Sequence, residues 1–259
     1  MPELPDVEIF KKEAEKALNK RVDHVKIRDR DFVEASRYKF NKHIEGNDLR
    51  KVWRKGKYLF LETGDHYSVV LHFGMTGLLK YAPGKEGPPE YTKLTFEMGD
   101  GHHLHYISKR KLGSVEITGE PEAYTGELDL GPDALQLEED AFTEKIKASR
   151  ASVKSFLMDQ SALSGIGNVY SDEMLYQAGI HPKADAGKLS DKETGKLFRK
   201  MKYVLEMAIE KEADVSRMPR TWLLPHREEG AGCPKCDGKI KTIKVTGRTT
   251  YYCPSCQKE

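Results

Sequence analysis

The sequence predicts an α+β protein: an N-terminal antiparallel β unit with a leading helix, followed by a helical unit that ends in a zinc-bound β-hairpin. Short runs rich in Val, Leu, Tyr and Phe dominate the first half of the chain, and apolar residues at helical spacing dominate much of the second half. All four cysteines stand in the last 27 residues. The expected boundaries are 1–117 for the β unit, 118–140 for a linker, 141–228 for the helical unit and 229–259 for the zinc hairpin.

The first expected element is a helix that begins almost at the N-terminus. Its apolar residues recur at helical spacing just after Pro2 and Pro5, namely Val7, Phe10, Ala14 and Leu18. From about residue 23 to residue 117, strand-like runs punctuated by Gly and Pro predict an antiparallel β unit. The acidic segment that follows is rich in Gly and Pro and is expected to be an exposed linker. Helical spacing returns over residues 142–211.

Composition limits the class of protein. With 259 residues and 38% hydrophobic content, the chain can form two modest cores, and 32% charged residues favour solubility. No run approaches the roughly 18 apolar residues of a membrane-spanning helix, and no apolar signal region stands at the start. We therefore expect no membrane partner and a cytoplasmic, nucleoid-associated location.

Charge is unevenly distributed although the formal net charge is only +2. Residues 116–144 hold ten carboxylates and no Lys or Arg, whereas residues 233–259 hold five Lys and one Arg against one Asp and one Glu. Further basic clusters occur at residues 50–57 and 109–111. Gathered on one face, these clusters would attract a phosphate backbone, and dispersed they would be ordinary solvated surfaces.

The cysteines form two C-x-x-C knuckles separated by sixteen residues. This spacing lets two turns present four thiolates to one structural Zn²⁺, and the ligands are Cys233, Cys236, Cys253 and Cys256. The β-rich stretches between the knuckles predict a hairpin with Arg248 near its tip. The metal stabilises a module too small to fold alone, and the tip is a candidate for nucleic-acid contact.

The N-terminus carries a second chemical signal. Removal of Met1 would leave Pro2 with a secondary α-amine, and α-amines have pKa values of about 8, so an appreciable fraction is unprotonated and nucleophilic at neutral pH. Glu3 beside it is a candidate acid. A carboxylate also stabilises a helix N-terminus, and this structural role is an ordinary alternative explanation for Glu3.

Four blocks of the sequence resemble the formamidopyrimidine-DNA glycosylase and endonuclease VIII family. They are MPELPDVE at residues 1–8, HFGMTG at 72–77, SGIGNVYSDEMLYQAGIHP at 164–182 and GRTTYYCPSCQ at 247–257. The blocks follow one another in order and include both ends of the chain. The start ELP, where endonuclease VIII relatives have EGP, is closer to the formamidopyrimidine branch.

The resemblance implies that the N-terminal β unit is a β-sandwich and that the helical unit contains a helix-two-turn-helix. It also implies a monomer that binds double-stranded DNA containing a damaged base or an abasic site. It implies a bifunctional glycosylase and lyase for oxidised purines, with formamidopyrimidines as the first expected substrates and 8-oxoguanine as the second. In the family, the residue matching Pro2 attacks C1′ of the damaged nucleotide, and the resulting iminium leads to β,δ-elimination. Two alternatives stay open: preference for oxidised pyrimidines, and a zinc-finger DNA-binding protein without catalysis.

The resemblance also assigns roles to single residues. Glu3 matches the catalytic acid, and Lys57, in the block RKGKYLF, matches the lysine that assists elimination at the lesion phosphate. His72, Asn168 and Arg248 match phosphate-binding residues, and Arg248 is also assigned to the catalytic set. The turn that includes Gly167 offers backbone N–H groups to a phosphate, although such a turn is often only a helix connector.

A flipped nucleotide leaves a gap in the duplex, which inserted side chains fill. Met75, Arg110 and Leu112 match the family's intercalating residues. The position of Leu112 is usually Phe in the family, and Met75 is also a residue that commonly fills gaps in cores.

The base pocket is where the match is weakest. Candidates are Asp6, which replaces the family's usual Glu, together with Glu173, Arg220 and Trp222, with His226 nearby. Relatives that recognise 8-oxoguanine carry a longer Gly-rich loop where this chain has residues 211–232. Trp222 is also explained by ordinary hydrophobic packing.

Overall fold

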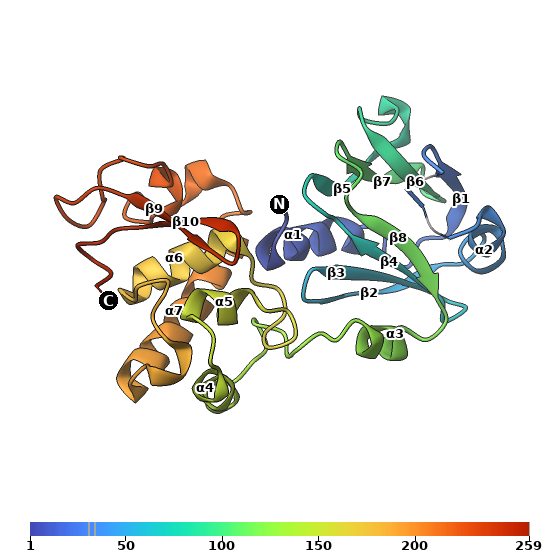
Figure 1. The fold of residues 1–259 in the computed structure, drawn as a ribbon. Helices are drawn as coiled ribbons and strands as arrows, with labels where there is room; N and C mark the ends of the chain where they lie inside the picture. Colours follow the sequence, from blue (N-terminus) through green and yellow to red (C-terminus); the bar gives the residue numbers. More distant parts are fainter. Residues whose placement is uncertain (31, 34, 259) are drawn as a thin grey trace. The chain divides into compact units, whose positions relative to one another are not determined.

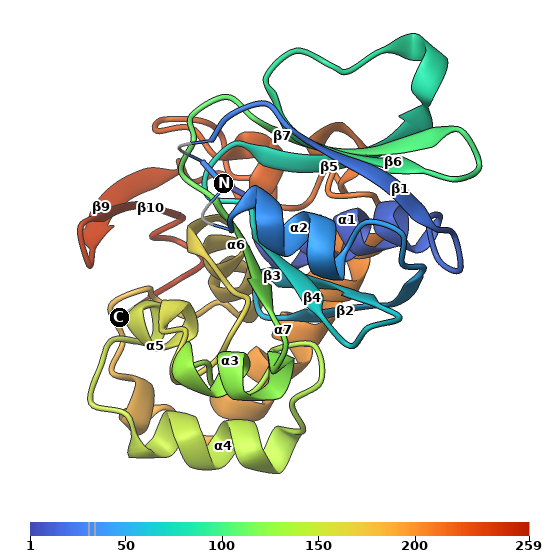
Figure 2. The same ribbon diagram turned by 90° about the vertical axis from the view of Figure 1, so that its right-hand side faces the viewer.

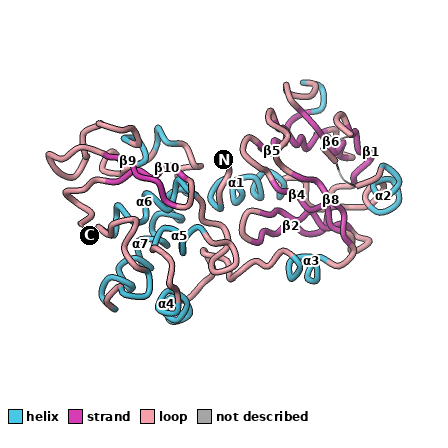
Figure 3. The backbone as a smooth tube through the Cα atoms, in the orientation of Figure 1, coloured by secondary structure: helices cyan, strands magenta, loops and turns pink. Residues whose placement is uncertain are grey.

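A computed structural model describes residues 1–30, 32–33 and 35–258, and it divides into two compact units. Unit 1 contains Met1–Pro2 and Asp6–Leu128, and unit 2 contains Glu3–Pro5 and Asp129–Glu259. The division at residue 128 falls inside the predicted linker. Unit 1 carries two four-stranded sheets, and unit 2 is mainly helical with a short hairpin (Figure 3).

Unit 1 is built on two four-stranded antiparallel sheets, visible as separate layers in Figures 1 and 2. The first sheet has the order β1-β6-β7-β5 and the second β2-β3-β4-β8. The strand bounds are β1 Val22–Ile27, β2 Leu49–Lys55, β3 Tyr58–Thr63, β4 Ser68–His72, β5 Gly77–Pro83, β6 Thr92–Met98, β7 His102–Ser108 and β8 Ser114–Thr118.

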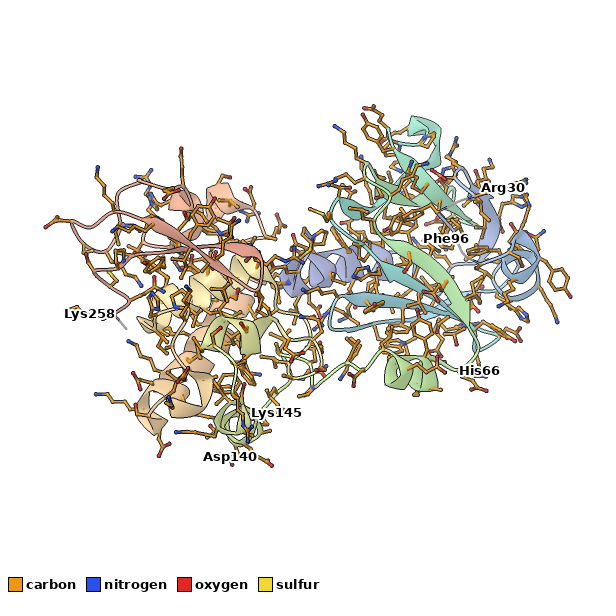
Figure 4. All side chains as sticks on the ribbon, viewed as in Figure 1. Arg30, His66, Phe96, Asp140, Lys145 and Lys258 are labelled. Atoms are coloured by element: carbon orange, nitrogen blue, oxygen red, sulfur yellow. The ribbon has the colours of Figure 1, made fainter. Side chains whose placement is uncertain are left out.

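The core of unit 1 lies between these sheets. Side chains alternate between the two faces of a strand, so Leu94 and Phe96 on β6 and Leu104 and Tyr106 on β7 enter the same buried cluster. Phe96, labelled in Figure 4, is 2% exposed. This architecture confirms the predicted α+β sandwich.

The leading helix α1 spans Leu4–Glu15, three residues earlier at both ends than the apolar spacing predicts. Pro5 is tolerated in the first turn because N–H groups there have no intrahelical partner. Turns follow Glu15, and Asn19 adopts a left-handed conformation with φ of 60°. Within unit 1 the helix packs through Phe10, whose ring centroid lies 4.6 Å from that of Phe73.

Two short helices interrupt the region predicted as strands and linker. Helix α2, Arg37–His43, is capped by the Ser36 hydroxyl, and α3, Pro121–Glu127, lies in the acidic segment. The Tyr124 ring packs edge-on against Phe60 with centroids 6.3 Å apart, and its hydroxyl donates to Glu116 Oε1 at 2.7 Å. The acidic segment is therefore anchored to the second sheet in part.

Unit 2 surrounds its own apolar cluster, to which α4, α5, α6 and α7 all contribute. The capping box at Ser190 and Glu193 begins α7. The element bounds are α4 Glu139–Ala148, α5 Val153–Met158, α6 Asn168–Ala178, α7 Asp191–Glu210, β9 Lys241–Val245 and β10 Arg248–Tyr252, with 3₁₀ turns η2 Ala186–Lys188, η3 Val215–Arg217 and η4 Leu224–His226. A further 3₁₀ turn, η1 Gly84–Glu86, belongs to unit 1.

A turn over residues 160–162 and the bends that follow it join α5 to α6. The Gln160 amide holds them, donating from Nε2 to the carbonyls of Met158 and Ile166 and accepting at Oε1 from the Gly165 N–H. Gly165 has a φ of 108°, which favours glycine. Among the described residues, no helix has the length and apolar character required to cross a membrane.

Candidate active site and metal centre

The carboxylate of Glu3 lies against the N-terminus of α6. Oε2 accepts hydrogen bonds from the N–H groups of Gly167 at 2.9 Å and Tyr170 at 3.2 Å, and Oε1 accepts from Val169 at 2.8 Å. Glu3 is 1% exposed. The first N–H groups of a helix lack intrahelical partners and carry partial positive charge, so they stabilise a carboxylate. Glu3 is therefore held in one position by the helix it caps.

This contact also accounts for Gly167. A Cβ at this position would lie 2.5 Å from Glu3 Oε1, so a larger residue would displace the carboxylate. The Gly167 N–H, expected from the sequence to face a phosphate, donates to Glu3 in this structure. Its role in binding DNA stays a prediction.

Pro2 precedes two anchored residues. The Glu3 side chain is fixed as described, and the Leu4 N–H donates to the Gly165 carbonyl at 3.0 Å. Met1 is 46% exposed. While Met1 is attached, the Pro2 nitrogen is an amide and not a nucleophile, so the amine chemistry inferred from the sequence requires removal of an exposed residue.

The predicted catalytic Lys57 and the predicted phosphate-binding His72 are electrostatic neighbours in unit 1. Lys57 lies in the turn between β2 and β3, and His72 ends β4 opposite Tyr58, with ring centroids 4.8 Å apart. Burial and the nearby Lys57 charge lower the pKa of His72 below its usual 6.5. His72 is therefore a neutral hydrogen-bonding group beside a cation at neutral pH.

The proposed intercalating residues lie on two loops of unit 1 that abut one another. Met75 is 39% exposed and Leu112 is 51% exposed. A Cβ on Gly74 would collide with the Leu112 backbone, and the Arg110 N–H donates to Thr76 Oγ1 at 3.0 Å. The loops thus present two apolar side chains and an exposed cation without packing them into the core.

Asn168 and Arg248 belong to unit 2. Asn168 is the first residue of α6, and its amide accepts from Lys154 Nζ at 2.8 Å and donates to the Thr249 carbonyl at 3.2 Å. Arg248, the first residue of β10, is exposed. Asn168 therefore connects α6 to the hairpin that presents Arg248, and phosphate binding by both residues stays a prediction.

The four cysteines converge as their spacing predicts. All four sulfurs lie within 4.8 Å of one another, with Cys233 and Cys256 3.8 Å apart and Cys236 and Cys253 3.6 Å apart. Zn–S bonds of about 2.3 Å at tetrahedral angles require sulfurs about 3.8 Å apart. None of the four is in a disulfide. The site fits one structural Zn²⁺, which would hold the hairpin in place of an extended apolar core.

The candidates for the base pocket are found in different environments. Asp6 is partly exposed on α1, and Arg220 is exposed. Trp222 is 1% exposed in the core of unit 2, its ring 5.9 Å from that of Tyr203, as the packing explanation expects. His226 is partly exposed, and its Nε2 lies 3.0 Å from the Arg220 carbonyl. A contact between Trp222 and a base would require its ring to leave the core.

Glu173 is fully buried on α6. Oε2 accepts from the Leu224 N–H at 2.8 Å, and Oε1 accepts from Gln177 Nε2 at 2.6 Å. Burial raises the pKa of Glu173 to about 7 from its usual 4.5. The carboxyl group therefore joins α6 to the segment around η4.

The pKa of Glu173 predicts how the stability of unit 2 depends on pH. Between about pH 4.5 and 7 the folded state keeps the proton that the unfolded state has lost, so the free energy of unfolding falls as the pH rises through this window. The total loss is about 3 kcal/mol, at about 1.4 kcal/mol per pKa unit. The free energy of unfolding, measured with urea near pH 5 and near pH 8, should decrease less in Glu173→Gln than in the unchanged protein, because glutamine cannot ionise. An equal decrease in both proteins would contradict the assignment.

Sequence patterns did not reveal a buried charged cluster in unit 2. Lys154 and Asp172 form an ion pair with both side chains 0% exposed, and Arg227 donates to Asp172 Oδ2 from Nε at 3.0 Å and from Nη2 at 2.8 Å. Burial lowers the pKa of Lys154 and raises the pKa of Asp172, and the attraction between them opposes both shifts. The sequence offered one signal for this cluster, which is that Lys154 stands among apolar residues. A lysine on a buried helix needs an ionic or hydrogen-bonding partner, because a buried charge without one is costly.

The segments of the chain that match known protein families follow its division into two units. Residues 1–115 match the model of the formamidopyrimidine-DNA glycosylase N-terminal domain, and residues 130–219 match the H2TH domain of that enzyme. Residues 233–258 match the zinc finger found in FPG and IleRS. The three matches therefore cover most of the chain.

Whole proteins and solved structures are also similar to this chain along nearly its full length. A formamidopyrimidine-DNA glycosylase of Arabidopsis thaliana is 36% identical and aligns with 100% of this chain and 71% of its own length. One from Pelotomaculum thermopropionicum is 31% identical, with 100% and 99% covered. The Lactococcus lactis Fpg bound to abasic-site DNA has a TM-score of 0.88 at 28% identity, covering 99% of this chain and 100% of that one. The same enzyme with FAPY-dG-containing DNA has a TM-score of 0.88 at 27% identity, with the same coverage.

Proposed function

The chain belongs to the formamidopyrimidine-DNA glycosylase family, and from that membership we propose that it excises oxidised purines, formamidopyrimidines foremost, through the amine of Pro2. As a member of the family it is a DNA glycosylase and lyase of base-excision repair that acts on damaged or abasic-site DNA. The nucleophile, the residue roles and the lesion preference are the parts of the proposal that require tests.

The observation that carries the proposal is the position of Glu3. Its carboxylate is fixed by three N–H groups at the N-terminus of α6, and the neighbouring Leu4 N–H donates to the Gly165 carbonyl. Adjacent Cα atoms are about 3.8 Å apart, so a Pro2 amine stands within one residue of a fixed carboxylate. A nucleophile beside a positioned proton carrier is the arrangement that covalent catalysis needs.

The chemistry then proceeds from the free Pro2 amine. Its lone pair forms a bond to C1′ as the bond from C1′ to the damaged base breaks and the base leaves with that electron pair. The nitrogen loses its proton to Glu3, which delivers a proton to the ring oxygen as the sugar opens to an iminium. The iminium acidifies the C2′ proton, and successive β- and δ-elimination expel the two flanking phosphates.

Lys57 and His72 support the elimination in this proposal. Phosphate groups gain negative charge as they leave, and a cation beside them stabilises that charge. Lys57 supplies the cation. His72, whose pKa is held low by burial and by the Lys57 charge, supplies a hydrogen bond that does not compete with Lys57 for a proton.

The conformation of residues 211–232 supports the proposal that formamidopyrimidines are preferred to 8-oxoguanine as substrates. It forms two 3₁₀ turns, η3 and η4, and it buries Met218, Trp222 and Leu224 in the core of unit 2. A segment anchored by three apolar side chains is poorly suited to fold over a flipped base as a mobile loop. We further propose that the protein works in the cytoplasm on the nucleoid, where reducing conditions keep the cysteines available for zinc.

A panel of duplexes, each with one lesion, tests the substrate class. We expect faster excision of a formamidopyrimidine than of 8-oxoguanine or thymine glycol, and no cleavage of the undamaged duplex. Preference for thymine glycol would move the chain to the oxidised-pyrimidine alternative. Binding without incision of an abasic-site duplex by the protein with a free Pro2 amine would support the non-catalytic alternative.

A further inference from the structure

One face of α6 carries three polar side chains that all contact the zinc module, by which we mean residues 229–258. The side chains are spaced four residues apart, which places them on one side of a helix. The three contacts are Asn168 Nδ2 to the Thr249 carbonyl at 3.2 Å, the Tyr251 N–H to Asp172 Oδ2 at 3.2 Å, and the Tyr176 hydroxyl to Cys233 Sγ at 3.1 Å.

The last of these contacts involves a metal ligand. Tyr176 is 1% exposed, and its hydroxyl lies 3.1 Å from the Cys233 sulfur. A buried hydroxyl is almost always hydrogen-bonded. A zinc-bound cysteine is a thiolate without a proton, so in the loaded protein the hydroxyl is the donor and the sulfur is the acceptor. Hydrogen bonds to ionised acceptors are among the strongest that proteins form.

We propose that Tyr176 is a positioning residue of the zinc centre, whose hydroxyl donates to the Cys233 thiolate and joins the zinc module to α6. Groups that hydrogen-bond to metal ligands orient them and tune the affinity for the metal. The same helix begins at Asn168 and is capped by Glu3, so retention of zinc is connected to the helix on which the proposed catalytic carboxylate rests.

Among the described residues, the other hydrogen bonds to these sulfurs come from within the module. The Lys235 N–H donates to Cys233 Sγ at 3.5 Å, and the Gly238 N–H donates to Cys236 Sγ at 3.4 Å. Such contacts follow from the local turn of a C-x-x-C knuckle. Tyr176 is 57 residues away from Cys233 in sequence, so its hydrogen bond is a tertiary contact.

The tyrosine ring is itself held in place. Lys235 Nζ lies 4.3 Å from the centroid of the Tyr176 ring and donates to Gln177 Oε1 at 2.8 Å. The ring also belongs to the buried cluster that includes Leu223 and Ile240. Replacement by phenylalanine would keep these ring contacts and remove only the hydroxyl, so Tyr176→Phe isolates the proposed hydrogen bond.

The experiment measures zinc affinity by competition with a chelating indicator. We expect Tyr176→Phe to bind zinc about 10- to 100-fold more weakly than the unchanged protein. Tyr203→Phe is the matched control, because Tyr203 lies on α7, is 38% exposed and contacts Trp222, outside the zinc module. It should bind zinc as the unchanged protein does. An affinity of Tyr176→Phe within twofold of the control overturns the proposal.

A spectroscopic measurement separates the hydrogen bond from a general loss of packing. With cobalt in place of zinc, loss of a donor to the thiolate raises the energy of the sulfur lone pair, so the sulfur-to-cobalt charge-transfer band of Tyr176→Phe should move to longer wavelength. An unmoved band overturns the proposal. If the variant does not fold, the unchanged chain loaded with an NMR-active cadmium isotope gives the result. Its Tyr176 hydroxyl proton should couple to the metal through sulfur, and absence of that coupling contradicts the hydrogen bond.

Discussion

A residue left in front of Pro2 should abolish base excision and strand cleavage together. The nitrogen of an acylated proline is an amide, whose lone pair is delocalised into the carbonyl, so it cannot form the bond to C1′. Loss of a catalytic nucleophile costs on the order of 10⁴-fold or more in rate. Single-turnover cleavage of a formamidopyrimidine duplex and borohydride trapping on abasic-site DNA should both fall to background in a protein with a short N-terminal extension.

The matched control is the same extended protein after a protease has removed the extension and exposed Pro2. Cleavage and trapping should return, because nothing else in the chain has changed. Pro2→Gly replaces the secondary amine by a primary amine, whose imine is neutral until it gains an extra proton. We therefore expect this variant to give less trapped adduct than the protein with Pro2. An undiminished adduct in the extended protein would show that another amine is the nucleophile and would remove Pro2 from the mechanism.

The zinc centre was predictable because its determinants are local in sequence. Two C-x-x-C knuckles fix which four sulfurs can converge, and the sulfurs of Cys233 and Cys256 are 3.8 Å apart as a tetrahedral site requires. The strands of unit 1 were predictable for the same reason, because runs rich in Val, Leu, Tyr and Phe are visible within six or seven residues. Local patterns therefore recovered which part of the chain is β-rich and which is helical, whereas the sandwich and the helix-two-turn-helix were implied by the family resemblance.

The contacts of Glu3 were not predictable from one sequence. Its carboxylate binds N–H groups that lie 164 or more residues away, and nothing in the pattern around Glu3 indicates which helix it caps. The same contact moves the start of α1, since Leu4 is anchored by Gly165. Tyr124 and Trp222 are similar cases. Their rings pack against Phe60 and Tyr203, which are remote in sequence, so composition alone left them in an exposed linker and a candidate pocket.

The buried cluster around Asp172 was the feature most distant from any sequence pattern, and it leads to a large expected effect on stability. Asp172→Asn should lower the free energy of unfolding by about 3 to 5 kcal/mol, the usual cost of leaving a buried charge without its partner. Lys154 is 0% exposed and would remain next to a neutral amide, while Arg227 is 20% exposed and can turn toward water. Urea unfolding of the zinc-loaded protein measures the loss.

A second substitution separates the buried charge from a change in shape. Lys154→Met removes the ammonium and keeps a side chain of similar length, so Asp172→Asn combined with Lys154→Met should be more stable than Asp172→Asn alone. Asp185→Asn is the control, because the Lys188–Asp185 pair lies on the surface of the same unit, and its loss should hardly move the midpoint. If the two substitutions in the cluster simply add, the ion pair is not what holds α5 and α6 together, and the apolar cluster around them must do so.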